Sequence, residues 1–199
     1  SRDWSEGARP MADNVKLLRD SVINAPVVMK GEYAYFVHPL TDGVPRQNAD
    51  LLEAARDLIS QKVNWENIDL ILGIEAMGLP LASALSISSG KPLVIARKRA
   101  YGLAGETVIN QNTGYSKGEI YLNDIQPEER ILVIDDVVST GGTIEPILQT
   151  LENIGAHIGD VHIIFEKGDG MDLLRQKYGW NLSSLVRLRM EGNEGVLLD

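Results

Sequence analysis

Residues 131–143 of this chain read Ile-Leu-Val-Ile-Asp-Asp-Val-Val-Ser-Thr-Gly-Gly-Thr. The apolar run predicts a buried strand over 130–135. The strand leads into two adjacent carboxylates, Asp135 and Asp136, and a turn of hydroxyl-bearing residues and glycine then opens a helix over 143–154. A strand, a tight turn and a helix in this order are typical of α/β proteins, which bind ligands at the carboxyl ends of their strands.

Short apolar runs alternate with longer amphipathic runs on both sides of this stretch. We therefore predict an α/β fold, with a parallel sheet flanked by helices. Right-handed crossovers would gather the loops between strands and helices at one edge of the sheet. The other strands are expected over 68–74, 92–96, 119–123, 158–166, 185–190 and 196–198, and the other helices over 14–24, 79–88 and 169–178.

The chain is expected to divide into three parts. Residues 1–13 are polar and predict an N-terminal extension that is disordered or foreign to the natural chain. Residues 14–46 contain two short apolar runs and a turn, which predict a small hairpin-like subdomain. Residues 47–199 form the α/β core, beginning with a helix capped by Asn48. Within this core, residues 97–118 are polar and contain four glycines, which predicts a long lid loop.

The composition argues against several classes of protein. The 199 residues include 28 acidic and 19 basic side chains, for a net charge of −9. An acidic chain lacks the basic footprint of a general nucleic-acid-binding protein. The absence of cysteine removes disulfides and thiol nucleophiles, and suits a reducing, cytoplasmic location. No apolar run approaches the ~18–20 residues of a membrane span, so no membrane partner is expected.

The turn that follows the acidic pair has the chemistry of an anion site. It offers consecutive backbone N–H groups at the start of a helix, where the helix dipole favours a phosphate. Asp135 and Asp136 would repel a phosphate, but they can accept hydrogen bonds from sugar hydroxyls or hold Mg²⁺ through water. A phosphate site beside a diol site fits a ribose 5-phosphate. The candidate phosphate-binding residues are Ser139, Thr140, Gly141, Gly142 and Thr143.

This stretch closely resembles the 5-phosphoribosyl 1-pyrophosphate (PRPP) motif of type I phosphoribosyltransferases. The surrounding segments look most like the archaeal hypoxanthine/guanine phosphoribosyltransferase group, which is itself similar to adenine phosphoribosyltransferases. The resemblance implies the type I phosphoribosyltransferase fold, with residues 14–46 as a hood over the base. The supporting segments are Tyr35–Pro39, Asp42–Pro45, Glu75–Gly78, Arg97–Leu103 and Thr113–Glu119.

The resemblance also implies a reaction: transfer of ribose 5-phosphate from PRPP to a purine, with Mg²⁺ as cofactor and pyrophosphate as leaving group. The acidic pair, Asp135 and Asp136, would orient the ribose hydroxyls as the catalytic residues. The pyrophosphate would lie against the turn after the strand over 68–74 and the cations after the strand over 92–96. The tip of the lid would close over the site. These residues are Ala76, Met77, Gly78, Arg97 and Lys98 for the pyrophosphate, and Tyr115, Ser116 and Lys117 for the lid.

The choice of base is less determined than the reaction. Phe36 is a candidate for stacking on a purine, and Glu166 and Lys167 are candidates for contacting its edge, where Lys167 can donate to a 6-oxo group. Phe36 also fits an ordinary alternating strand, and Lys167 also fits an exposed lysine. The known hypoxanthine/guanine enzymes carry an acid where this chain has Ser139, and adenine enzymes often have a lid glutamate where Gly114 stands here. The sequence therefore names no general acid or base.

Several functions stay open at this stage. A hypoxanthine/guanine phosphoribosyltransferase comes first and an adenine phosphoribosyltransferase second. A non-catalytic PRPP-binding regulator and an orotate or uracil transferase are further alternatives, because all of them share the PRPP motif. The expected partners are PRPP, a purine base and a second copy of the chain in a homodimer.

Overall fold

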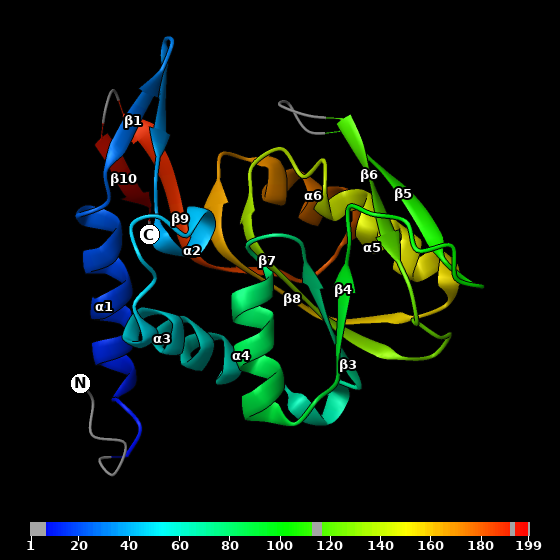
Figure 1. Cartoon of the computed structure of the whole chain (residues 1–199). Coiled ribbons are helices and arrows are strands. Elements are labelled where there is room, and N and C mark those ends of the chain that lie inside the picture. The colour runs from blue at the N-terminus through cyan, green and yellow to red at the C-terminus, as the bar shows by residue number, and fades with distance from the viewer. Residues whose placement is uncertain (1–6, 113–116, 192–193, 199) are drawn as a thin grey trace.

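A six-stranded sheet forms the centre of the chain, which we describe from a computed structural model over residues 7–112, 117–191 and 194–198. Its strands are β3 (Leu70–Ile74), β4 (Leu93–Ala96), β7 (Arg130–Val138), β8 (His157–Lys167), β9 (Leu182–Glu191) and β10 (Glu194–Leu198). They lie in the order β10-β9-β8-β7-β3-β4 (Figure 1). Strands β4, β3, β7, β8 and β9 run parallel, and β10 is antiparallel to β9. The predicted parallel sheet is confirmed.

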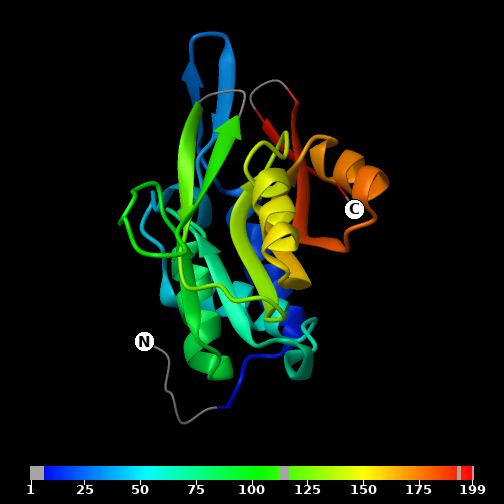
Figure 2. The same cartoon turned by 90° about the vertical axis from the view of Figure 1, so that its right-hand side faces the viewer.

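Helices cover both faces of this sheet, as Figures 1 and 2 show. One face carries α5 (Ile144–Ile154) and α6 (Gly170–Tyr178). The other carries α3 (Ala49–Ser60) and α4 (Leu79–Ser89), with α1 (Met11–Ile23) packed against α3. A short 3₁₀ helix, η1 (Trp65–Asn67), precedes β3. In the described part of the chain, no helix is long and apolar enough to cross a membrane.

The apolar run of β7 supplies both cores. Ile131 and Val133 pack with α5 and α6, whereas Leu132 and Ile134 pack with α3 and α4. This division follows from the strand geometry, because successive side chains point to opposite faces of a sheet. All four side chains are fully buried. An uninterrupted apolar run is therefore what a parallel strand covered on both sides requires.

The strand β7 extends further than the sequence predicts. It continues through the acidic pair to Val138, which pairs with Glu166 of β8. The prediction that the strand ends at Asp135 is wrong, because β8 offers backbone partners for β7 beyond that point. The carboxylates are consequently held on a paired strand and not on a free loop.

The N-terminal region forms the expected small subdomain. It contains the antiparallel hairpin of β1 (Val27–Lys30) and β2 (Tyr33–Phe36), followed by the one-turn helix α2 (Pro39–Asp42). Phe36 packs edge-to-face against Phe165 of β8, with ring centroids 5.7 Å apart. The subdomain therefore rests on the C-terminal strands of the sheet.

Two expectations near the N-terminus need correction. The helix α1 begins at Met11, three residues before the predicted start, and Arg9 bonds to Asp50 with 3.1 Å between the charged atoms. The end of the 1–13 extension is thus tied to the core. Asn48 precedes α3, but its side chain makes no capping hydrogen bond, so the predicted cap is wrong.

The sequence predicts one long loop over residues 97–118, but part of this stretch forms paired strands. Strands β5 (Thr107–Asn112) and β6 (Lys117–Leu122) pair as an antiparallel hairpin. Its inward residues Ile109 and Ile120 are buried in the cluster with α5, which explains why this polar stretch is ordered. The predicted lid residues Tyr115 and Ser116 lie outside the described residues, and Lys117 is exposed at the start of β6.

Candidate active site

A cavity of about 540 Å³ lies at the carboxyl edge of the sheet. The two hairpins, β1-β2 and β5-β6, rise on either side of this edge (Figure 1). The cavity collects residues from six separate parts of the chain, including most of the predicted site. Its lining includes Phe36, Ala76, Met77, Lys98, Asp135, Asp136, Ser139, Thr140, Gly141, Gly142, Thr143 and Lys167.

The turn between β7 and α5 forms one end of the cavity. Gly141 has a φ of +86°, a backbone conformation that favours glycine. The Thr140 hydroxyl accepts a hydrogen bond from the Gly142 N–H at 3.3 Å. The turn runs directly into the 11-residue helix α5, whose N-terminus faces the cavity through Thr143 and Ile144. Backbone N–H groups and a helix dipole at this position can hold a phosphate.

The acidic pair lies beside this turn. Asp135 is 6% exposed, and its Oδ1 accepts a hydrogen bond from the Asp136 N–H at 2.8 Å. Burial and the negative charge of Asp136 raise the pKa of Asp135 well above its usual range. Burial likewise raises the pKa of Asp136. Ionisation of the pair is therefore unfavourable in the free site, and a bound cation or hydroxyl donors would make it more favourable.

These two carboxylates fit a Mg²⁺ ion that arrives with its phosphates. Among the described residues, no three His, Asp or Glu side chains are grouped as a metal site. Magnesium in phosphate chemistry is usually held by one or two carboxylates together with water and the substrate phosphates. Asp135 and Asp136 supply that number of ligands.

A second turn enters the cavity after β3. Its residues Glu75, Ala76 and Met77 line the cavity, and the Glu75–Ala76 peptide is cis. Gly78 does not line the cavity. A Cβ atom at Gly78 would lie 2.7 Å from a carbonyl oxygen of β3 and 2.9 Å from one of β7, so the glycine lets this turn pack closely on the sheet.

Glu75 joins this turn to the cations that follow β4. Its two carboxylate oxygens accept hydrogen bonds from Arg97 Nε at 3.0 Å and from the Lys98 N–H at 2.8 Å. Lys98 lines the cavity, whereas the Arg97 guanidinium lies outside it, 5.6 Å from the ring centre of Tyr101. Glu75 has no predicted role, although an acid directly after a strand at this edge is a signal in the sequence.

Phe36 and Lys167 meet in the lining of the same cavity. The Lys167 Nζ lies 5.6 Å from the centre of the Phe36 ring. Phe36 is held by the ring of His38, with a centroid separation of 5.5 Å, and by the edge of Phe165 at 5.7 Å. Burial lowers the pKa of Lys167, while the charges of Asp42 and Asp136 oppose this shift. Phe36 is only 5% exposed, so this part of the cavity offers mainly the Lys167 donor, and the predicted stacking of a purine on Phe36 has little free ring face to use.

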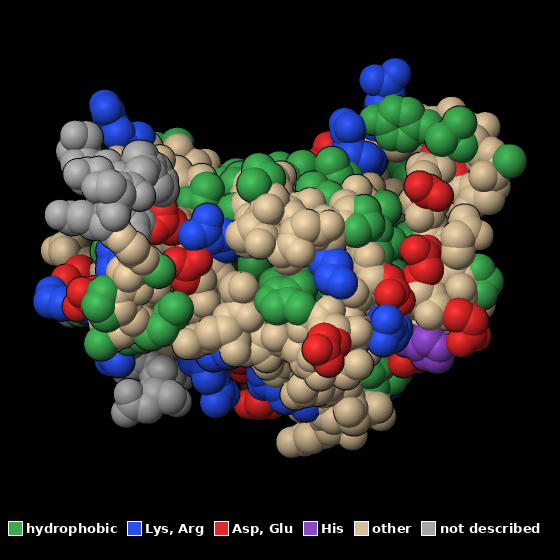
Figure 3. All heavy atoms as spheres, turned by 90° about the horizontal axis from the view of Figure 1, so that it is seen from below, with side chains coloured by type: hydrophobic (Ala, Val, Ile, Leu, Met, Phe, Trp, Pro, Cys, Tyr) green, Lys and Arg blue, Asp and Glu red, His purple; other side chains and the backbone are tan. Residues whose placement is uncertain are grey.

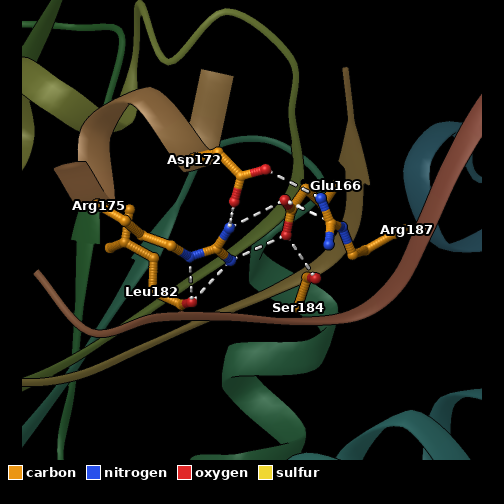
Figure 4. A network of polar contacts seen from close by, with 6 residues as sticks. All are labelled: Glu166, Asp172, Arg175, Leu182, Ser184 and Arg187. Atoms are coloured by element: carbon orange, nitrogen blue, oxygen red, sulfur yellow. Dashed lines mark hydrogen bonds and ion pairs between the residues drawn. The ribbon is translucent and has the colours of Figure 1, made fainter. Parts of the chain in front are cut away.

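Glu166 does not line the cavity, in contrast to the prediction that it contacts the base. Its carboxylate is 1% exposed and lies on the other side of β8, where Arg175, Ser184 and Arg187 surround it (Figure 4). Neighbouring residues of a strand point to opposite faces, so Glu166 and Lys167 cannot both face the base. Gln111 of β5 lines the cavity and was missed, because its segment was predicted to be a loop.

Comparisons with known proteins agree with this arrangement. A phosphoribosyl transferase domain matches residues 46–185. A protein of Aciduliprofundum boonei named hypoxanthine/guanine phosphoribosyltransferase is 42% identical over 93% of this chain and 100% of its own length. A protein of the same name from Methanothrix soehngenii is 47% identical over 88% of this chain and 92% of its own length.

Solved structures show the same fold at lower identity. The adenine phosphoribosyltransferase of Rhodothermus marinus has a TM-score of 0.72 and 20% identity, over 89% of this chain and 99% of its own. The enzyme of the same name from Thermoanaerobacter pseudethanolicus has a TM-score of 0.71 and 21% identity, over 87% and 99%. From its sequence, its fold and the match over 46–185, this chain belongs to the phosphoribosyl transferase domain family.

Proposed function

We propose that this chain is a purine salvage phosphoribosyltransferase that joins hypoxanthine or guanine to the ribose 5-phosphate of PRPP and releases pyrophosphate. The observation that carries the proposal is the single cavity, which holds a phosphate turn, an acidic pair and a lysine beside an aromatic ring. These features match the phosphate, the ribose and the base of a nucleotide. The names of the archaeal relatives support the same activity.

The residues of the cavity then have separate tasks. The turn of residues 139–143 holds the 5-phosphate and so fixes one end of the sugar. Asp135 and Asp136 accept hydrogen bonds from the ribose hydroxyls, and their charge favours the positive charge that develops on the sugar. Lys98 and the turn at Ala76 and Met77 receive the pyrophosphate. When bound, Mg²⁺ supplies further neutralisation of the leaving group.

The base preference follows from the chemistry of Lys167. An ammonium group has three donors and no acceptor, so it pairs with a 6-oxo oxygen and not with a 6-amino group. A purine that leaves a buried donor unpaired is rejected at a cost in free energy. The buried Phe36 ring lies beside this donor and leaves the lysine as the main polar group for the base. This arrangement favours hypoxanthine and guanine over adenine.

The assembly and location are part of the same proposal. The chain acts as a cytoplasmic homodimer, with residues 14–46 as a hood on the core of residues 47–199 and with Tyr115, Ser116 and Lys117 as the lid residues. Nucleic acid is not a partner. The net charge of −9 supports this point. Figure 3, which shows the face seen from below in the orientation of Figure 1, has basic side chains interspersed with acidic ones.

An assay of nucleotide formation tests the proposed function. The chain is given PRPP and Mg²⁺ with hypoxanthine, guanine, adenine or orotate in turn. We expect inosine and guanosine monophosphate to form fastest. The double variant Asp135→Asn, Asp136→Asn should lose most turnover, while Asp20→Asn, an exposed carboxylate on α1, should not. Failure to form nucleotide from any purine would refute the proposal.

A further inference from the structure

The first turn of α6 forms the wall behind the phosphate turn. A Cβ atom at Gly170 would lie 2.0 Å from the Ser139 carbonyl oxygen, and one at Gly141 would lie 2.9 Å from Leu174 Cδ1. Neither contact leaves room for another atom. The position of α6 therefore determines where the backbone of residues 139–141 can lie.

The same helix carries an arginine that binds residues of β8 and β9. Arg175 donates to both carboxylate oxygens of Glu166, from Nη1 at 3.0 Å and from Nη2 at 2.9 Å. It also donates to the Leu182 carbonyl oxygen from Nε at 3.0 Å and from Nη2 at 2.8 Å. Figure 4 shows this guanidinium between α6, β8 and β9. A two-pronged arginine–carboxylate pair fixes direction as well as distance.

Other contacts complete the network around Glu166. The Ser184 hydroxyl donates to Glu166 at 2.8 Å, and Asp172 accepts from Arg175 at 2.7 Å and from Arg187 at 3.0 Å. Burial opposes the ionisation of Glu166, but the hydrogen bonds from Arg175 and Ser184, with the nearby positive charges, lower its pKa overall. The buried carboxylate is therefore ionised and firmly held.

Glu166 is the residue before Lys167 on β8. Successive residues of a strand point to opposite faces, so holding the Glu166 carboxylate on the α6 side orients Lys167 toward the cavity. We infer that Arg175 is a positioning residue for base recognition. It acts through Glu166 to hold Lys167 at the purine 6-position, and it ties the end of β8 to α6, the helix that packs against the phosphate turn. This inference rests on the proposed function.

Steady-state kinetics of Arg175→Met test the inference. We expect the KM for hypoxanthine to rise by about tenfold, as the loss of ~1.4 kcal/mol of binding would produce, with a smaller change in kcat. The preference for hypoxanthine over adenine should fall in parallel. Arg175→Lys keeps the charge but loses the two-pronged geometry, and it should recover only part of the preference.

Two further variants separate positioning from stability. Arg175→Met leaves the buried Glu166 carboxylate with only Arg187 and Ser184 as partners. The double variant Glu166→Gln, Arg175→Met is therefore measured as well, because it removes both charges of the main pair. Arg130→Met is the matched control. Arg130 makes a similar two-pronged pair with Asp69, at 3.0 and 2.9 Å, at the start of β7 and outside the cavity. This control should lower the melting temperature without changing the base preference.

The outcomes are distinct. If the wild-type chain turns over purines and the Arg175 variants keep its KM for hypoxanthine and its base preference, as Arg130→Met does, Arg175 is merely structural and the inference is wrong. If the wild-type chain forms no nucleotide from any purine, the proposed function fails and the inference fails with it.

Discussion

Ionisation of Asp135 is unfavourable in the folded, ligand-free protein, and a bound ligand would offset this free-energy penalty. Burial and the charge of Asp136 raise its pKa, which means that the folded chain holds this proton more tightly than the unfolded chain does. The stability from that proton is fully present below the unfolded pKa of about 3.9 and is lost as the pH rises through the folded pKa. Above the folded pKa, ionised Asp135 therefore lowers the free energy of unfolding.

Asp135→Asn should stabilise the ligand-free chain at pH 7 while abolishing most turnover. The amide removes the charge but keeps an oxygen for the Asp136 N–H. We expect the melting temperature to rise by roughly 2–4 °C, the effect of about 1 kcal/mol in a chain of this size. The gain should shrink as the pH falls toward 4. Thermal unfolding at both pH values measures it, with exposed Asp20→Asn as the control, and a lower melting temperature at pH 7 would contradict the prediction.

Lys167 makes a separate prediction about the base. Lys167→Met keeps most of the length of the side chain but removes the donor that faces the 6-position. The loss of a hydrogen bond from a charged group, ~1.5–3 kcal/mol, should reduce kcat/KM for hypoxanthine by about 10–100-fold. Adenine should lose less, because its amino group gains nothing from this donor. Lys177→Met, on the exposed side of α6, is the control, and an equal loss for both bases would contradict the assignment.

At the level of elements, the close packing of α6 on the phosphate turn can be tested with a substitution that only adds a methyl group. Alanine is ordinarily better than glycine in a helix by about 1 kcal/mol, so Gly170→Ala would stabilise α6 if space allowed. The Ser139 carbonyl oxygen, 2.0 Å from the added Cβ, leaves none. The helix or the turn must move, and such overpacking typically costs ~1–3 kcal/mol.

We therefore expect Gly170→Ala to lower the melting temperature and to raise the KM for PRPP more than the KM for the purine. Thermal unfolding and steady-state kinetics measure the two effects. Gly118→Ala serves as the stability control, because a Cβ atom there meets nothing within 4 Å. An unchanged KM for PRPP together with an unchanged melting temperature would show that the phosphate turn is not held by α6.

The elements also show which local signals the sequence carries. The apolar run of 131–134 predicted its strand, because burial on both faces leaves an uninterrupted pattern. Strand β5 was missed because it has only two apolar residues, Val108 and Ile109, in a polar segment. The predicted short strand over 119–123 matches most of β6, but its pairing with β5 was not predicted. The extension of β7 to Val138 depends on pairing with β8, which is distant in the sequence.

At the scale of the whole molecule, the sequence placed most of the cavity because parallel strands deliver their following loops to one edge. Asp136, Thr140 and Lys167 meet there as expected. The sequence could not separate Glu166 from Lys167, since the face of a strand residue depends on its register with neighbours. Nor could it show that Arg175, nine residues further along the chain, pairs with Glu166.

The assembled cavity makes a prediction for the chain as a whole. A ligand that binds only the folded state stabilises it by RT ln(1 + [L]/Kd), which is about 2.7 kcal/mol at one hundred times Kd. PRPP with Mg²⁺ at that level should raise the melting temperature by roughly 5–10 °C in a chain of this size. Removing Mg²⁺ with a chelator should reverse most of the shift, because the buried carboxylates would again face the phosphates without a cation. In Asp135→Asn, Asp136→Asn the shift should be smaller and less sensitive to the chelator, whereas in Arg130→Met it should equal that of the wild type. A shift that is the same with and without Mg²⁺ would show that PRPP binds without using the acidic pair.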